Sequence, residues 1–306
     1  MPHAHDHRDH HDHAHGGANF GTAFAAATVL NLGLVAAQIF YGLAANSVAL
    51  LADAGHNFGD ALGLVLAWGG YVLSRAAPTE RFTYGFRSAS ILSALINAIL
   101  LLVATGAIAW EAILRLGRPQ ETNGLLVMAV AGAGIVINGL SAWLLMAGRE
   151  RDLNIRSAFA HLAADAGVSA GVVIAGAVLL VTRWTWVDPV ASLLISVAIV
   201  WGTWGLLRES LQMSMDAVPQ GISITDVRGY LENLPGVAGV HDLHIWAMST
   251  TETALTVHLV CHGGRAGDAF LMDAVHELDR RFGIHHATIQ IEAGELECRL
   301  APTNVV

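Results

Sequence analysis

Six apolar runs, each long enough to cross a bilayer, occupy most of the first two thirds of the chain. About 20 apolar residues suffice for a helix to span the hydrocarbon core. Helices are the expected structure there, because lipid offers the backbone no hydrogen-bond partners. We therefore predict an all-α transmembrane bundle of six helices, at residues 20–43, 47–73, 89–114, 124–146, 158–181 and 187–207.

The composition supports a membrane protein with a smaller soluble part. Only 13% of the residues are charged and 54% are hydrophobic, whereas a soluble domain has about 25% charged residues. All 16 basic residues are Arg and the net charge is −9, which argues against nucleic-acid binding. Two cysteines, Cys261 and Cys298, make no disulfide framework and fit a reducing compartment.

Two of the apolar runs carry a His and an Asp four residues apart. The second run carries Asp53, His56 and Asp60, and the fifth carries His161 and Asp165. A charged side chain at the bilayer centre costs about 2.5–3.5 kcal/mol on insertion scales, so each of these residues requires a partner or a function. Residues four apart stack on one face of a helix. Each of the two helices therefore presents one imidazole and one carboxylate together.

Two imidazoles and two carboxylates suit a tetrahedral, zinc-like ion. Two carboxylates match the charge of a dication, and no Arg stands at comparable depth to neutralise them. The alternative is that each His bonds a neighbouring carbonyl and each Asp pairs with an Arg. Because ligating His must be deprotonated and titrates at about 6.5, we expect metal and protons to displace each other. A bundle that opens alternately to the two sides would then exchange metal for protons.

Two further polar positions are less decisive. Asp53 precedes His56 by three residues, so it either supports the metal site or its entry path, or it serves helix packing. Glu111 and Arg115 have the i,i+4 spacing of an ion pair, which favours a structural role.

The placement of Arg residues indicates the orientation of the bundle. Cytoplasmic connections carry an excess of basic residues, and a six-to-three bias places both termini in the cytoplasm. The six are Arg75, Arg81, Arg87, Arg149, Arg151 and Arg156, and the three on the other side are Arg115, Arg118 and Arg183.

A His-rich leader, residues 1–18, precedes the first run. Its composition predicts a disordered cytoplasmic segment, and it lacks the apolar core of a signal peptide. Its imidazoles could capture borderline-soft cations weakly, or it could be only a solvated polar leader. Residues 19–207 are then the six-span domain.

Residues 208–306 read as a soluble cytoplasmic domain, because charges, prolines and alternating patterns replace the long apolar runs. A helix at 224–234 would begin near Ser223 or Thr225 and stop at Pro235. Alternation and β-branched residues predict strands, and the second helix would end at Gly283. The expected order is helix, strand 237–246, strand 253–261, helix 268–282 and strand 287–292, an α+β sandwich of type αββαβ.

At these residues the chain resembles the cation diffusion facilitator family, in its zinc/cadmium/cobalt efflux branch. The motifs HNFGD at 56–60 and HLAAD at 161–165 carry the resemblance, with SVALLADAGHN and HDLHIW beside them. The resemblance implies a homodimeric metal/proton antiporter that exports dications across a bacterial inner membrane, with a ferredoxin- or metallochaperone-like cytoplasmic domain. His56, Asp60, His161 and Asp165 would be its transport site. His56, at the first position of the pair in the second span, implies Zn²⁺ as the preferred ion, with Cd²⁺ and Co²⁺ as alternatives. Export of these ions would give metal resistance.

The resemblance also implies a regulatory metal site in the cytoplasmic domain. His241, His258, His285 and Glu292 match the family's cytosolic ligands, and Cys298 could complete the set. They could equally be polar surface residues of a sheet, and His244 and His286 could be bystanders or bridging partners. Some family members have another site in the loop after the second span, but here RAAPTERFTYGFRS contains no His. We expect that site to be absent or degraded.

Three other functions fit parts of the pattern. A haem-binding membrane oxidoreductase could use His56 and His161 as axial ligands, but it leaves the carboxylates unexplained. An intramembrane metalloprotease needs a general-base Glu, as in His-Glu-x-x-His, and the chain has no such motif. A metal sensor that transports nothing stays open.

Overall fold

The computed structural model describes residues 17–118, 120–146, 153–262, 267–294, 298 and 300. The predicted leader therefore lies, apart from its last two residues, outside the described part. The chain folds as two compact units, one made of Met1–Ala61 with Val103–Ile199 and the other of Leu62–Leu102 with Val200–Val306.

Long helices make up the chain before the C-terminal domain. Four described segments are long and apolar enough to cross a membrane: Ala89–Gly117, Gly124–Trp143, His161–Thr182 and Val187–Ser214. These four segments indicate a multi-pass membrane protein, as expected. The helices are α1 (Gly17–Ala45), α2 (Val48–Ser74), α3 (Ala89–Gly117), α4 (Gly124–Met146), α5 (Leu153–Thr182) and α6 (Val187–Ser214).

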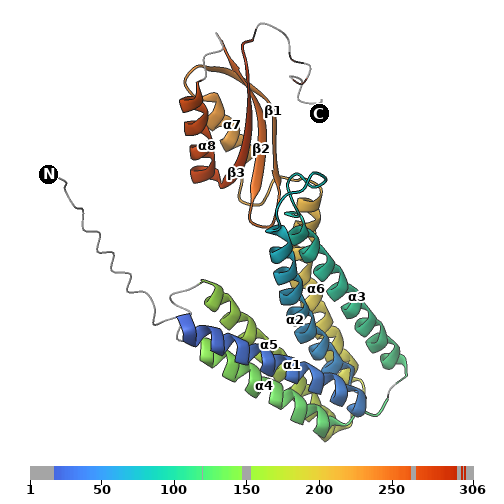
Figure 1. Ribbon diagram of the computed structural model, residues 1–306. Helices are drawn as coiled ribbons and strands as arrows, with labels where there is room; N and C mark the ends of the chain where they lie inside the picture. Colours follow the sequence, from blue (N-terminus) through green and yellow to red (C-terminus); the bar gives the residue numbers. More distant parts are fainter. Residues whose placement is uncertain are drawn as a thin grey trace, which may run out of the picture. The chain divides into compact units, whose positions relative to one another are not determined.

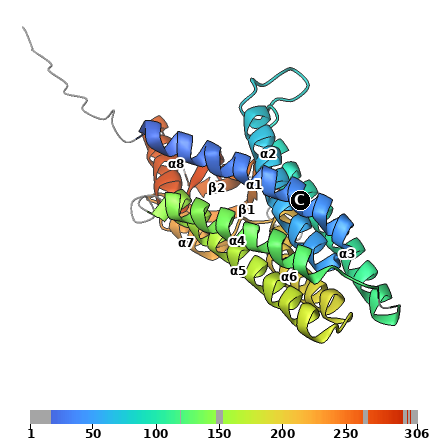
Figure 2. The ribbon, with the colours of Figure 1, turned by 90° about the horizontal axis from the view of Figure 1, so that it is seen from below.

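In the first unit, α4 packs along α5 and against α1 (Figures 1 and 2). Glycine makes the closest approach between α4 and α5. A Cβ atom added at Gly124 would lie 2.9 Å from the carbonyl oxygen of Gly176, and one added at Gly176 would lie 2.7 Å from Met128 Cγ. Small residues of this kind let membrane helices approach closely without a hydrophobic driving force.

The start of α2 is fixed by charged groups from two other helices. Asp188 of α6 is buried and accepts hydrogen bonds from the Ser47 hydroxyl and, at 2.7 Å, from the Val48 backbone N–H. Arg115 of α3 donates to the Asn46 carbonyl at 2.7 Å and, as predicted, pairs with Glu111 at 2.8 Å. A carboxylate is favourable at a helix N-terminus because free N–H groups and the helix dipole meet there. These contacts set where α2 begins, and so where its site residues lie.

The C-terminal sheet belongs to the second unit. Its strands pair in the order β1-β2-β3. β1 runs antiparallel to β2, and β2 runs parallel to β3. α7 and α8 cover one face of this sheet (Figure 1). Leu231, Leu255, Leu259, Leu278 and Ile284 form the centre of the core between the two layers. The elements are α7 (Ile224–Glu232), β1 (Val237–Ala247), β2 (Thr253–Cys261), α8 (Asp268–Phe282) and β3 (Ile284–Glu292).

The ends of α6, α7 and β3 are among those that differ from the sequence expectation. α6 continues to Ser214, past the predicted end at residue 207, because backbone hydrogen bonding continues beyond the apolar run. α7 stops at Glu232, two residues early. β3 begins at Ile284 and not at 287, because Gly283 ends α8 in a left-handed conformation (φ 65°) and the chain enters the strand at once.

Candidate metal centres

The four membrane residues predicted as ligands lie together in the first unit. Across the two helices, His56 Nε2 is 3.3 Å from Asp165 Oδ1, and His161 Nε2 is 3.3 Å from Asp60 Oδ2. Within each helix, the His-to-Asp distance is 3.6 Å. Each imidazole therefore stands beside both carboxylates, one from its own helix and one from the other.

The membrane cluster has the chemistry of a cation site. Ligand atoms of His56, Asp60 and Asp165 all lie within 4.8 Å of one another, and His161, the most exposed member, stands just outside that group. Within the described part of the chain, His56 Nδ1, Asp60 Oδ2 and Asp165 Oδ1 are buried without a hydrogen bond. Buried carboxylates that lack donors carry uncompensated charge, which a dication bound among them would neutralise.

Asp53 lies one turn before His56 on α2 and is fully buried. Its Oδ2 accepts hydrogen bonds from Gln38 Nε2 of α1 at 2.6 Å and from the Ser169 hydroxyl of α5 at 3.1 Å. It is therefore bonded to groups that the sequence analysis did not connect with it. The partners could not be identified from the sequence, because they lie on two other helices.

A second cluster lies on the sheet of the C-terminal domain. His241 of β1 stands opposite His258 of β2 in the antiparallel pair. Glu292 of β3 reaches both, with Oε2 3.3 Å from His241 Nε2 and Oε1 3.0 Å from His258 Nδ1. Cys298 Sγ is 3.8 Å from His258 Nδ1, and ligand atoms of all four residues lie within 4.8 Å of one another.

The face of the sheet that carries this cluster is the one away from the helices. Leu255, Val257 and Leu259 point into the core with α7 and α8, and side chains alternate along a strand, so His258 points to the other face. Burial acts to raise the pKa of Glu292, but hydrogen bonds from Cys298 and Gln290 and the two nearby imidazoles outweigh it, and the pKa is lowered. Glu292 thus stays ionised, as a ligand must.

Comparison with known proteins matches both parts of the chain. Residues 24–213 match the cation efflux transmembrane domain, and residues 219–294 match the cytoplasmic domain of cation efflux proteins. The chain belongs to the cation diffusion facilitator family. Its resemblance to the zinc/cadmium/cobalt branch is confirmed by these matches and by the relatives that follow.

Curated relatives match over most of their length. The zinc transporter ZitB of Escherichia coli K12 is 37% identical over 262 residues, which cover 85% of this chain and 83% of that protein. The cadmium, cobalt and zinc/H(+)-K(+) antiporter of Bacillus subtilis is 31% identical, covering 86% of each chain. The metal cation efflux system protein CzcD of Cupriavidus metallidurans is 31% identical, covering 94% of this chain and 91% of that one.

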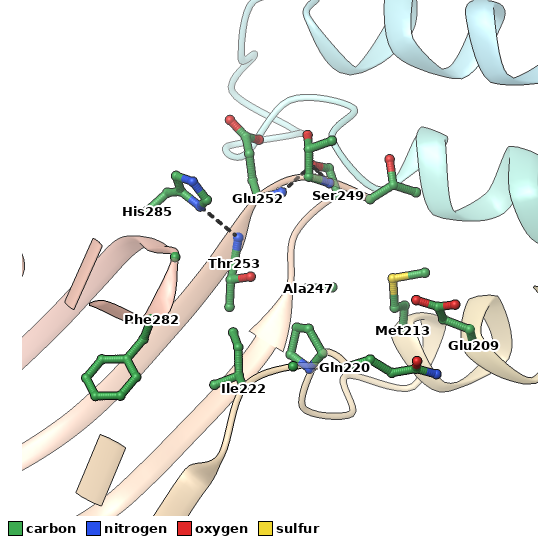
Figure 3. A pocket seen from close by; sticks show the side chains of 15 residues that line it. Glu209, Met213, Gln220, Ile222, Ala247, Ser249, Glu252, Thr253, Phe282 and His285 are labelled. Carbon is green, nitrogen blue, oxygen red and sulfur yellow. Dashed lines mark hydrogen bonds between the residues drawn. The ribbon is translucent and has the colours of Figure 1, made fainter. Parts of the chain in front are cut away.

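His285 was predicted as a ligand of the second cluster, but the structure does not place it there. His285 follows Ile284, which pairs with Thr253, whereas His258 pairs with Gln290 further along β3. His285 accepts a hydrogen bond from the Thr253 N–H at 3.5 Å and lines a cavity of about 320 Å³ with Glu209 and Glu252 (Figure 3). The sequence placed His285 near the third strand, but only the register shows that it lies at the other end.

Asp242 is a residue of the second cluster that the sequence analysis missed. It stands at a register shift in β1 with φ 51°. One of its oxygens lies 3.4 Å from His258 Nε2, and the other lies 3.0 Å from His244 Nε2. The one available signal was its place between His241 and His244, since the irregular strand that turns it toward His258 has no sequence signature.

Proposed function

We propose that this protein exports divalent transition-metal cations from the cytoplasm in exchange for protons, through the site formed by His56, Asp60, His161 and Asp165. The observation that carries the proposal is the convergence of the two His-x-x-x-Asp pairs. Two cross-helix distances of 3.3 Å leave all four side chains able to share one ion after small adjustments.

Zn²⁺ is the preferred substrate in this proposal, with Cd²⁺ and Co²⁺ as alternatives. Two imidazole nitrogens and two carboxylate oxygens suit a tetrahedral borderline ion, and two carboxylates match its charge. The relatives named as zinc transporters and as cadmium, cobalt and zinc antiporters support this substrate class. Zn²⁺ binds here as cargo.

Proton exchange follows from the same ligands. An imidazole binds metal only when neutral, so a proton on His56 or His161 weakens the metal site and metal binding displaces that proton. A conformational change that exposes the site alternately to each side then couples the two gradients. The relative named as a cadmium, cobalt and zinc/H(+)-K(+) antiporter supports exchange.

The same proposal includes the domain plan. Residues 1–18 form a cytoplasmic leader, 19–207 form six spans, and 208–306 form an αββαβ cytoplasmic domain, with both termini in the cytoplasm of a bacterial cell. The match to the family's cytoplasmic domain supports a homodimer. In that domain His241, His258, Glu292 and Cys298 hold a regulatory Zn²⁺, with Asp242 beside them.

A haem-binding oxidoreductase is less consistent with the geometry. Two axial imidazoles must face each other across a porphyrin, whereas Asp60 and Asp165 lie within 3.3 Å of the imidazole nitrogens of the opposite helix. The positions that a porphyrin would fill are taken by carboxylates. A visible absorption spectrum of the purified protein tests this alternative directly.

The experiment for the main proposal is metal flux into vesicles that contain the purified protein, with and without a pH gradient. Asp60→Ala and Asp165→Ala should abolish flux. Glu277→Ala is the control, because it removes a carboxylate that is paired with Arg280 and Arg281 on α8, outside both clusters. Full flux in both aspartate variants would refute the site. Loss of metal tolerance in His161→Ala, with expression and dimerisation intact, would argue against the sensor.

A further inference from the structure

Four helices meet in a buried polar network one turn away from the metal cluster. Gln38 of α1, Asp53 and Asn57 of α2, and Ser169 of α5 are buried side by side. Asn57 Nδ2 donates to Gln38 Oε1 at 3.1 Å, and Gln38 and Ser169 both donate to Asp53 Oδ2. Gly134 of α4 packs against Ser169 and Gln38 and brings the fourth helix to the network.

Asp53 is the acidic residue of this network, and one of its two carboxylate oxygens has no hydrogen-bond partner in the described structure. Both donors reach Oδ2, whereas Oδ1 is buried with no hydrogen bond within the described residues. The other charged groups nearby are His56 and Asp60 of α2 and His161 and Asp165 of α5. In their described segments α1 and α4 carry no Asp, Glu, His or Arg.

Two further charged groups on the surrounding helices have partners of their own. Glu111 of α3 pairs with Arg115, and Asp188 of α6 holds the start of α2. Asp53, Asp60 and Asp165 therefore make three carboxylates around a site for one dication. A dication matches two of them, and the third needs one more positive charge.

The space around Asp53 favours a proton over a metal or alkali ion. A Cβ atom added at Gly134 would stand only 2.9 Å from the Ser169 hydroxyl and 3.6 Å from Gln38 Nε2, so the helices already touch. An alkali or alkaline-earth ion needs six or more oxygen ligands at about 2.3 Å or more. A proton needs one lone pair, and Asp53 Oδ1 offers it.

We propose that Asp53 carries a further proton in the transport cycle, in addition to any proton displaced from the imidazole ligands, and that the metal and this proton compete through charge and not through a shared ligand atom. This inference rests on the proposed antiport. Metal bound at His56 and Asp165 favours the Asp53 carboxylate, so the O–H bond of Asp53 breaks and the proton leaves to water. When the metal has left, a proton returns to Oδ1.

The test counts protons released when Zn²⁺ binds the purified full-length protein, by calorimetry in buffers of different ionisation enthalpy. Asp53→Asn keeps the shape and an acceptor for Gln38 and Ser169, but it cannot release a proton. It should bind Zn²⁺ about tenfold more weakly, a usual size for coupling between sites, and release one proton fewer per ion. Asp53→Glu should restore the proton.

The outcomes separate the two proposals. If the unaltered protein releases no protons and a pH gradient drives no flux, the antiport itself is wrong. If the unaltered protein behaves as an antiporter and Asp53→Asn releases the same number of protons, only the role of Asp53 is wrong. Complete loss of Zn²⁺ binding in Asp53→Asn also overturns it, because Asp53 would then be a ligand.

A second variant keeps the test decisive if Asp53→Asn does not fold. Ser169→Ala removes one donor from the Asp53 carboxylate, so the ionised form is less favoured and proton-coupled flux should peak at higher pH. Ser192→Ala is the matched control, because the Ser192 hydroxyl is buried without a hydrogen bond in the described structure. An unchanged pH profile in Ser169→Ala would contradict the proposal.

Discussion

The two candidate metal centres are built from similar ligands on different supports. The membrane cluster takes i,i+4 pairs from two helices, and its most exposed member, His161, stands outside the tightest group of ligand atoms. The cytoplasmic cluster takes residues from three adjacent strands plus Cys298, and all four converge. Strand pairing fixes the cytoplasmic ligands, whereas the membrane ligands approach only as their helices do. The difference agrees with the proposal that the membrane cluster releases its ion and the cytoplasmic cluster holds one.

Removing a membrane ligand should have the largest effect. Asp165→Asn should slow Zn²⁺ transport by at least about 100-fold, since the loss of groups that merely support metal ligands already costs 10–100-fold. Zn²⁺ binding to the cytoplasmic cluster should stay unchanged. Vesicle flux and the stoichiometry of bound metal measure the two effects, and parallel losses at both clusters would remove the distinction between them.

The converse change sharpens the comparison. His258→Ala removes the residue that contacts Glu292, Asp242 and Cys298, and it should weaken cytoplasmic Zn²⁺ binding by about 10–100-fold. Flux at saturating metal should fall by much less than in Asp165→Asn, because a regulatory Zn²⁺ modulates transport but does not lie in the transport site. His285→Ala is the control, and it should affect neither quantity. A flux loss as large as that of Asp165→Asn would show that the cytoplasmic cluster is part of the transport site.

The thiol of Cys298 should have a smaller effect, on which metal ion the cytoplasmic cluster prefers. Thiolates favour softer ions, so Cys298→Ser should lower the cytoplasmic preference for Cd²⁺ over Zn²⁺ by about tenfold, or about 1.4 kcal/mol. Transport selectivity should not change, since the membrane ligands contain no sulfur. Competitive binding of the two ions and competitive flux check the two halves of this prediction.

The smallest expected effect lies outside both clusters. Hydrogen bonds from Arg280 and Arg281 lower the pKa of Glu277 to about 2. A lowered folded-state pKa contributes stability above the unfolded-state value of about 4.3, and this stability is lost as the pH falls toward 2. Glu277→Gln should therefore reduce the protection of α8 amides from hydrogen exchange at pH 6, and less at pH 3, where part of this stability is already lost. Equal losses at both pH values would contradict this assignment, and metal binding should be unaffected.

The parts of the fold that depend on local chemistry could be predicted from the sequence. α8 has the predicted bounds because Gly283 ends it, and Ser223 caps α7 as one of two candidates. The i,i+4 pairs on α2 and α5 needed only helical periodicity. These features follow from neighbours along the chain.

The parts that depend on register and on contacts between helices could not be predicted. His285 and Glu292 lie on the same strand, but only the pairing of β2 with β3 shows that His285 is far from His258. Asp242 joins the cluster through a local irregularity of β1. The partners of Asp53 come from α1 and α5, and no spacing in the sequence connects them.

The most direct test of the central claim is the ligand environment of the membrane-bound ion. In the full-length protein carrying His258→Ala and Cys298→Ser, X-ray absorption should show one Zn²⁺ per chain with four nitrogen or oxygen ligands at about 2.0 Å and no sulfur. Adding Asp165→Ala should remove that ion. If the ion stays bound with the same ligands after Asp165→Ala, the His56, Asp60, His161 and Asp165 site is not where the metal binds.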